Sequence, residues 1–282
     1  QEKYGIVFAF LGSVSEEERP PLLEIEEFGQ EGWRSNMVLA FEVGFNFERS
    51  IENGLDPAHN EFVHPYQGFK GINRDTYKIN EIVPEDHNQG WGFWFMHTFD
   101  AQPLSESDDP TSKGTTSWGD SRSERSNVQA GGGTHGPNIL ITHIRITPET
   151  GFRQYFFEAP IDEHKTKIFF VNNRNFLLDP DMDEPIQGRN FVLAQQDIDI
   201  LEDVYPLQTP LTIDQEVLVP ADVPILAYRE WLAKFDAALG TVFESLSQHR
   251  SLAKILLVSG AGLGRPFDEH LFNLLDRFAE MI

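Results

Sequence analysis

Apolar side chains alternate with polar or small ones in several separate stretches, a pattern typical of half-buried β-strands. The stretches with this period are 39–47, 91–99, 139–146, 152–158 and 166–173. The opening residues, QEKYGIVFAFLG, also have strand character, and an acidic connector containing prolines follows them. Short turns join the last three stretches, so neighbouring strands are expected to pair in an antiparallel sheet.

One long segment between these stretches lacks any such period. Residues 103–136 consist largely of Ser, Asp, Thr and Gly and include three consecutive glycines at 131–133. Because few apolar side chains could anchor this segment and many of its residues favour turns, we expect a mobile loop. Such a loop could cover the mouth of a cavity.

From Asn190 onward the apolar spacing changes from two residues to about 3.6, the period of an α-helix. Helices are expected at about 190–205, 223–239, 242–258 and 267–281. Asp222 is a suitable N-cap for the second of them, and Gly240 is a suitable stop. Strands followed by helices predict the α+β class, in which helices pack against an antiparallel sheet.

The first of these helices has two contrasting arcs on a helical wheel. The polar arc holds Gln195, Gln196, Asp199, Glu202 and Asp203. The opposite, apolar arc holds Phe191, Leu193, Ala194, Ile198, Ile200, Leu201, Val204 and Tyr205. Asp197 lies in the middle of the apolar arc, where an unpaired carboxylate would cost several kcal/mol. Asp197 therefore needs a cation, which is either an arginine such as Arg174 or Arg189, or a metal ion.

Two of the nine histidines are close in sequence, within ENGLDPAHNEFVHP (52–65). Asp56 followed by Pro57 predicts a helix start, and Pro65 predicts a helix end near His64. The spacing of His59 and His64 fits a metal pair and a pair of surface or core histidines equally well. Together with Asp197 they would form the 2-His-1-carboxylate triad of non-haem Fe(II) sites, although zinc hydrolases use the same ligand types.

The amino-acid composition excludes several kinds of active site and partner. The absence of cysteine excludes thiolate nucleophiles and any iron–sulfur cluster held by these 282 residues. A metal site must then use His, Asp and Glu. The 45 acidic against 22 basic residues give a formal net charge of −23, which argues against nucleic acid as a partner. No stretch is apolar enough to span a membrane and no signal peptide is present, so a cytoplasmic location is expected.

ENGLDPAHNEFVH resembles the D-x2-H-x4-H element of Rieske-type non-haem iron oxygenases, the alpha subunits of ring-hydroxylating oxygenases. QQDIDILE (195–202) resembles the segment that carries their third ligand, and the resemblance extends from the opening strand to about residue 232. It implies a helix-grip catalytic domain of the START/Bet v 1 kind. It also implies that His59, His64 and Asp197 ligate Fe(II), that Asp56 is an acidic bridge for electrons, and that Asn53 lies near the metal.

The family's [2Fe-2S] Rieske cluster needs two Cys and two His ligands. Because the chain has no Cys, the resemblance implies that the cluster lies on a missing domain. The expected organisation is a strand and acidic connector over 1–35, a helix-grip catalytic domain over 36–239 and a C-terminal helical extension over 240–282.

The resemblance implies an oxygenase that activates O2 at Fe(II) and hydroxylates or demethylates an organic, cyclic substrate. Its expected partners are a ferredoxin or reductase as electron donor and further copies of itself in a homotrimer. The alternative is a metal-free helix-grip module that binds an apolar small molecule, but such a module has no reason to place Asp197 on an apolar helix face. His97 and His143 are expected to be pocket-lining or core residues rather than further ligands.

Overall fold

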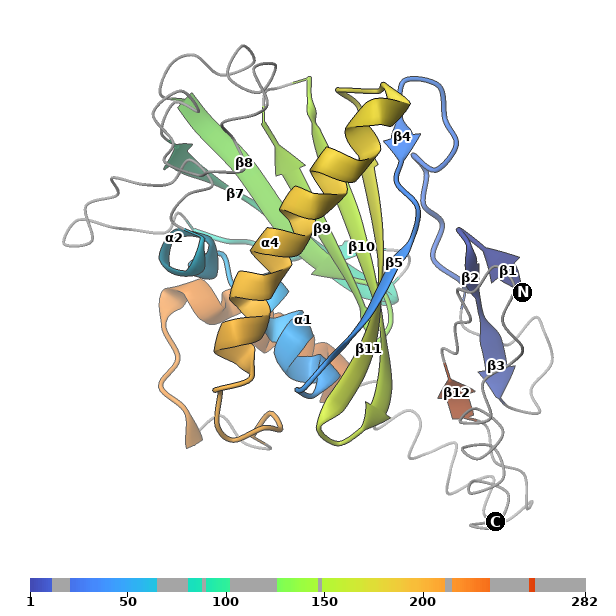
Figure 1. Ribbon diagram of the computed structural model, residues 1–282. Coiled ribbons are helices and arrows are strands. Elements are labelled where there is room, and N and C mark those ends of the chain that lie inside the picture. The colour runs from blue at the N-terminus through green and yellow to red at the C-terminus, as the bar shows by residue number, and fades with distance from the viewer. Residues whose placement is uncertain are drawn as a thin grey trace.

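An antiparallel sheet forms the centre of the structure, with a long helix lying across one of its faces (Figure 1). The structure is a computed structural model that describes residues 1–11, 21–64, 81–87, 90–101, 126–146, 149–210, 215–233 and 254–256. Eight strands of the described chain make up this sheet, in the order β4-β11-β10-β9-β8-β7-β6, with β5 also paired to β11. The α+β fold expected from the sequence is confirmed.

Five of the eight strands of the central sheet follow period-two stretches of the sequence, whereas β4, β6 and β8 fall outside them. Their bounds are β4 Arg34–Ser35, β5 Leu39–Val43, β6 Glu85–His87, β7 Gly92–Ala101, β8 Ser126–Thr134, β9 Ile139–Arg145, β10 Gly151–Asp162 and β11 Lys165–Arg174. Three further strands near the N-terminus are β1 Glu2–Lys3, β2 Ile6–Val7 and β3 Ala9–Leu11. The opening strand is therefore present, but it is divided into short pieces.

The two faces of the sheet have different coverings, because side chains alternate along each strand. Tyr155 and Phe157 on β10 pack against the N-terminal segment around Ile6 and Leu23. The intervening side chains of the same strand, including Phe152 and Phe156, face the helices. The site described below lies on this second face.

The helices of the described chain gather on that face (Figure 1). They are α1 Phe47–Leu55, α2 His59–Val63, the short 3-10 turn η4 Pro180–Met182 and α4 Asp183–Leu201. A second 3-10 turn, η6 Pro220–Asp222, leads into a helical segment over 223–233. None of these helices is long and apolar enough to cross a membrane.

The strand expected over 39–47 ends early, at Val43, and that part of the prediction is wrong. Asn46 caps α1 instead, because its side chain accepts a hydrogen bond from the Glu48 N–H at 2.9 Å. Phe47, Ile51 and Leu55 then follow at helical spacing and form the apolar face of α1, which packs into the core. Phe45 and Phe47 continue the alternating pattern beyond the end of the strand by chance, so the pattern predicts a strand that is too long.

The expectation of a mobile loop over 103–136 is also wrong for its last part, since residues 126–134 form β8 between β7 and β9. The glycines there serve close packing. A Cβ on Gly131 would lie 2.0 Å from the carbonyl oxygen of Phe95 on β7, so a larger residue would push the two strands apart. Residues 102–125 lie outside the described part of the chain.

The helix expected over 190–205 begins earlier and ends earlier, as α4 Asp183–Leu201. Ion pairs from Arg34 and Arg174 to Asp183 hold its first turn. The wheel was wrong for three residues of the apolar arc, because Phe191, Ile200 and Tyr205 are exposed. The sheet covers a narrower strip of α4 than the sequence pattern indicates.

Near the C-terminus the helix predictions are partly wrong. The second helix begins at 223 as expected, but the 3-10 turn Pro220–Asp222 precedes it, and Asp222 closes that turn by accepting a 2.7 Å hydrogen bond from the Val219 N–H. Within the helix expected at 242–258, Lys254–Leu256 forms the strand β12, which pairs with β3. Gly240 and the helix expected at 267–281 lie outside the described residues.

Candidate metal centre

A sharp turn between α1 and α2 places the first histidine of the candidate site. Asp56 ends α1, and its carboxylate accepts a 2.8 Å hydrogen bond from the Ala58 N–H. The expected helix start at Asp56 is thus displaced, since α2 begins at His59. The His59 Nδ1 hydrogen-bonds the Asp56 carbonyl oxygen, which leaves Nε2 of His59 as the nitrogen free to bind another group.

The second histidine ends the same helix. His64 is the C-cap of α2, as the following proline predicts, and its backbone N–H bonds the Asn60 carbonyl. Its side chain is only 3% exposed, and its Nδ1 is hydrogen-bonded to Oε1 of Gln196 on α4 at 2.8 Å. As with His59, the Nε2 atom is the one left for another group. Sequence reasoning missed Gln196, because the wheel placed it on the exposed arc.

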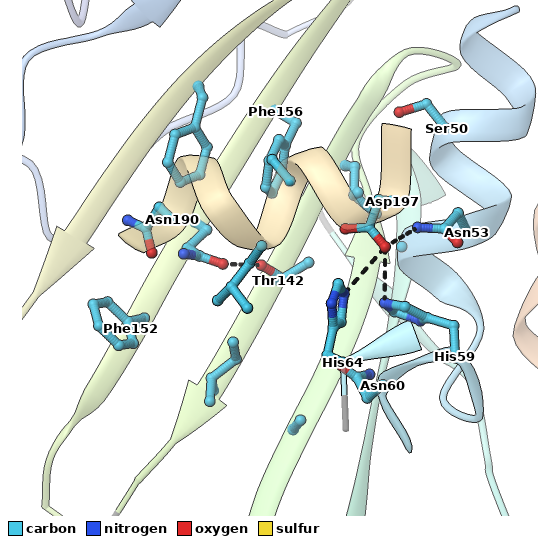
Figure 2. Close-up of a pocket in the computed structure, with 18 of the residues that line it drawn as sticks. Ser50, Asn53, His59, Asn60, His64, Thr142, Phe152, Phe156, Asn190 and Asp197 are labelled. Carbon is cyan, nitrogen blue, oxygen red and sulfur yellow. Dashed lines mark hydrogen bonds and ion pairs between the residues drawn. The ribbon is translucent and has the colours of Figure 1, made fainter. Parts of the chain in front are cut away.

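Asp197 reaches both histidines from α4 (Figure 2). Its Oδ1 lies 3.1 Å from Nε2 of His64 and 3.9 Å from Nε2 of His59. The candidate ligand atoms of these three residues all lie within 4.8 Å of one another, so the structure brings them to one centre across 138 positions of sequence from 59 to 197. Among the described residues they form the one such group of His, Asp and Glu. Their role as ligands stays a prediction.

Within the described part of the chain, the Asp197 carboxylate is paired with histidines rather than with an arginine. Arg174 pairs with Asp183 at the start of α4 instead, at 2.6 Å. Asp197 receives a further hydrogen bond from Nδ2 of Asn53 on α1, at 3.1 Å, which holds its side chain toward the histidines (Figure 2). Asn53 therefore lies at the centre, as the sequence resemblance implies, although its function there stays a prediction.

Charge and burial oppose each other at this centre. Burial favours the neutral carboxyl of Asp197, but the hydrogen bond and charge of His64 outweigh it and hold the Asp197 pKa below its usual value. Burial likewise lowers the His64 pKa, and Asp197 more than reverses this, so the net shift is upward. For His59 burial dominates and the pKa is lowered, which favours the neutral, metal-binding ring.

An apolar cavity of about 210 Å³ opens beside the three groups, between α4 and the sheet. This is below the roughly 300–1,000 Å³ of pockets that hold drug-sized ligands, so a smaller molecule is indicated. Its wall is mostly aromatic and aliphatic, and polar side chains are confined to a few places. The lining includes Phe41, Phe95, Leu140, Ile144, Phe152, Phe156, Phe170 and Leu193.

The two other strand histidines behave as the sequence analysis expects. His97 on β7 lines the cavity, and burial lowers its pKa to about 4, so it is neutral at ordinary pH. His143 on β9 is buried on the opposite face, with its ring stacked on Trp94 at 5.7 Å. Neither belongs to the group of candidate ligands.

His143 predicts a loss of stability in mild acid. Burial, and then the charges of Arg153 and Arg145, lower its pKa to about 3 from the usual 6.5. Between these values the unfolded chain binds a proton that the folded chain does not, so stability falls as the pH falls below 6.5. Each pH unit should cost about 1.4 kcal/mol. Urea unfolding from pH 7 to pH 5 should show a shallower dependence for His143→Phe, and an unchanged slope would contradict the assignment.

Two imidazole nitrogens and one carboxylate on a shared face leave the remaining coordination positions of a metal open. This suits a metal that must bind small molecules as well as protein. Zinc hydrolases use the same donors, but the HExxH helix of zinc proteases is absent from the sequence. In this protein the two histidines come instead from a short helix after a turn.

Comparison with known proteins identifies a family for most of the chain. Residues 43–238 match the family model described as the vanillate O-demethylase oxygenase C-terminal domain. No curated protein sequence matches the chain.

Several solved structures share the fold. NdmA of Pseudomonas putida CBB5, solved with caffeine, superposes with a TM-score of 0.58 at 20% identity, over 88% of this chain and 63% of that one. NdmB of the same organism gives 0.53 at 17% identity, over 75% and 52% of the two chains. Dicamba monooxygenase bound to dicamba gives 0.53 at 14%, over 80% and 65%. The chain therefore spans less than two thirds of each, and identities this low show the fold alone.

Proposed function

The chain belongs to the family of vanillate O-demethylase oxygenase C-terminal domains, the catalytic domains of Rieske-type oxygenases, and on this basis we propose that it activates O2 at a mononuclear Fe(II). The reaction is hydroxylation or demethylation of a small organic, cyclic substrate in the neighbouring cavity. The observation that carries this proposal is the convergence of His59, His64 and Asp197 within 4.8 Å beside that cavity.

The residues present fit Fe(II). Both histidines have Nδ1 engaged by a hydrogen bond and direct Nε2 to the centre, which is the arrangement of metal-bound imidazoles. The carboxylate of Asp197 faces them and supplies the negative charge. When bound, the iron supplies the chemistry of O2 reduction at the coordination positions that these ligands leave open.

The surrounding residues hold this set of ligands in place. The Asp56 carbonyl and the Gln196 side chain fix the two rings from behind, and Asn53 fixes the Asp197 carboxylate. The apolar wall of the cavity excludes bulk water from the bound substrate, which protects the reaction from side reactions. The chain thus supplies orientation and a dry cavity.

The proposed reaction needs electrons from elsewhere. Hydroxylation consumes one O2, two electrons and two protons, placing one oxygen atom in the product and releasing the other as water. Fe(II) can supply one electron, and the chain has no Cys for a Rieske cluster. We therefore assign the electrons to a [2Fe-2S] cluster outside these 282 residues, fed by a ferredoxin or reductase. In a homotrimer, Asp56 would lie at the contact through which they arrive.

The test is anaerobic titration of the chain with Fe(II), which should show one ion bound per chain. With NAD(P)H alone the loaded chain should not turn over, whereas adding a reductase and the cluster-bearing component should start substrate-dependent O2 uptake. Multiple turnovers with NAD(P)H alone would contradict this assignment of electrons. A chain that binds an apolar small molecule but no iron would instead be the metal-free binding module.

Replacing Asp56 with asparagine should lower turnover by about 10–100-fold while iron remains bound. The amide keeps the turn to Ala58, but it removes the charge from the proposed electron path. Stopped-flow measurement of cluster oxidation, with iron content determined on the same sample, checks this. Asp162→Asn is the matched control, because Asp162 makes the same kind of turn to the His164 N–H on the surface. Equal rates in both variants would remove Asp56 from the path.

Replacing Gln196 with leucine should weaken Fe(II) binding by about 10–100-fold. The substitution keeps the size of the side chain but removes the acceptor that orients the ring of His64. Gln195→Leu is the control, since Gln195 is exposed and bonds only Asp199 among the described residues. Anaerobic Fe(II) titration of both variants is the measurement, and equal affinities would show that Gln196 does not support the site.

A further inference from the structure

A row of polar side chains crosses the otherwise apolar face of the sheet under α4. Thr142 on β9 lies directly opposite Gln154 on β10, and Gln154 lies opposite Asn172 on β11. Asn36, just beyond β4, extends the row by donating its backbone N–H to the Asn172 carbonyl at 2.9 Å. Phe152 and Phe156 flank Gln154 on the same strand. Buried polar groups in such surroundings need hydrogen-bond partners. The donor and the acceptor of each hydrogen bond in the row can therefore be assigned by starting from a residue that can only donate.

Arg174 fixes the direction at the buried end of the row. Its guanidinium can only donate, and it donates from Nη1 to Oδ1 of Asn36. The Asn36 amide is held from its other side as well, because its Nδ2 donates to the Asp183 carbonyl at 3.0 Å. The oxygen of Asn36 must therefore face Arg174 and the row.

The orientation of each amide in the row then fixes the orientation of the next one. Nδ2 of Asn172 donates to Oδ1 of Asn36 at 3.5 Å, so the oxygen of Asn172 points the other way. That oxygen accepts from Nε2 of Gln154 at 3.2 Å. The oxygen of Gln154 is thereby turned toward Thr142, whose hydroxyl donates to it at 3.0 Å. Each amide orientation follows from its neighbour rather than from a free choice.

The row ends at the wall of the cavity with a defined polarity. A threonine hydroxyl has one hydrogen, and Thr142 uses it on Gln154. Its oxygen retains lone pairs, and Thr142 is half-buried and lines the cavity. In the view of Figure 2 it lies between Asn190 and the three candidate ligands. Thr142 therefore presents an acceptor to whatever occupies this part of the cavity.

We propose that Thr142 is a specificity-determining residue that accepts a hydrogen bond from a hydroxyl or N–H group of the substrate. The inference rests on the proposed function for its biological meaning, and it narrows the substrate to a small ring compound with such a donor. The donor is a neutral group, because a charged one would be costly to desolvate in this apolar cavity. Of the polar side chains that α4 contributes to the cavity lining, Asn190 offers both a donor and an acceptor, and Arg189 offers donors only, so neither replaces the acceptor of Thr142 as the partner of a substrate donor by its polarity alone.

The test compares para-methoxyphenol with para-dimethoxybenzene, two rings that differ only in methylation of one hydroxyl. Calorimetric titration of the iron-free chain should show para-methoxyphenol binding about three- to tenfold more tightly, the effect of one hydrogen bond. Thr142→Val keeps the shape of the side chain and should remove the preference. Thr142→Ser keeps the hydroxyl and should retain it.

Three outcomes would overturn the proposal: equal or tighter binding of para-dimethoxybenzene, a preference that survives in Thr142→Val, or binding of neither ring. The second would place the acceptor elsewhere, as on Asn190. Fe(II) titration of the same preparation separates this proposal from the proposed function. Iron binding without a ring preference removes only the role of Thr142, whereas a preference without iron binding removes only the iron chemistry.

Discussion

Replacing Asp197 with alanine is expected to lower the Fe(II) affinity by more than about 100-fold, because a direct ligand should matter more than the supporting residues around it. The substitution also leaves the Asn53 amide and His64 Nε2 without their shared carboxylate. Anaerobic Fe(II) titration, followed by metal analysis after gel filtration, measures the loss. Circular dichroism establishes that α4 remains folded.

Asp199→Ala is the matched control for this experiment. Asp199 lies two residues further along the same helix, is exposed and bonds the Gln195 side chain. Its removal takes away the same charge from α4 without touching the centre, so Fe(II) affinity should stay unchanged. Equal iron retention by the two variants would mean that Asp197 is not a ligand.

The second large effect is expected at a buried group of charges that fixes α1. Glu52 on α1 accepts hydrogen bonds from Nε of Arg229 at 2.6 Å and from Nη2 at 2.9 Å, and Arg49 approaches it at 3.2 Å. Arg229 also pairs with Glu216, and Arg49 bonds the carbonyls of Pro206 and Gln208. Through these contacts α1, which carries Asn53, is tied to the chain that follows α4.

Arg229→Met should therefore destabilise the protein by about 3 kcal/mol, since it leaves the buried carboxylate of Glu52 with only part of its compensation. Methionine retains most of the apolar packing, so the loss reports on charge. Equilibrium urea unfolding measures it. Arg145→Met makes the same chemical change at an exposed residue that bonds Gln129, and it should cost less than about 0.5 kcal/mol. Similar losses in both variants would contradict the role of the buried pair.

The strands could be predicted well from the sequence, and the reason is local. Each strand from β9 to β11 buries apolar side chains on both faces, against the helices and against the N-terminal segment, so its sequence is rich in residues that favour strands. The prediction from composition failed at β8, where the glycines have a packing role. The glycines of β8 indicate a loop by composition, but they are required by the close approach of Phe95 on the next strand.

The helix α1 shows a different kind of failure. The spacing of Phe47, Ile51 and Leu55 was available in the sequence, as was the cap at Asn46. This helical spacing overlaps the alternating strand pattern of residues 39–47. No local rule decides between a helix and a strand for the shared residues. Packing decides, because a Cβ on Gly54 would lie 2.2 Å from Leu140, so this helix rests directly on the sheet.

The residue types that are available for chemistry can be recognised from the amino-acid sequence. Without cysteine, two histidines near an Asp-Pro turn and a carboxylate on an apolar helix face were the candidates for a metal site. The need of Asp197 for a cation also followed from the sequence alone, because burying an unpaired carboxylate is costly wherever the helix packs. These inferences depend on local pattern and on the chemistry of single side chains.

The partners of those side chains, in contrast, depend on how distant segments fold together. Among the residues that the structure describes, Asp197 meets histidines and not an arginine, and Gln196 orients a ring 132 positions away. The fold also determines the polarity of Thr142, which depends on Arg174 through three intervening amides. Hydrogen-bond direction is a property of partners brought together by folding, and no single stretch of sequence contains both partners.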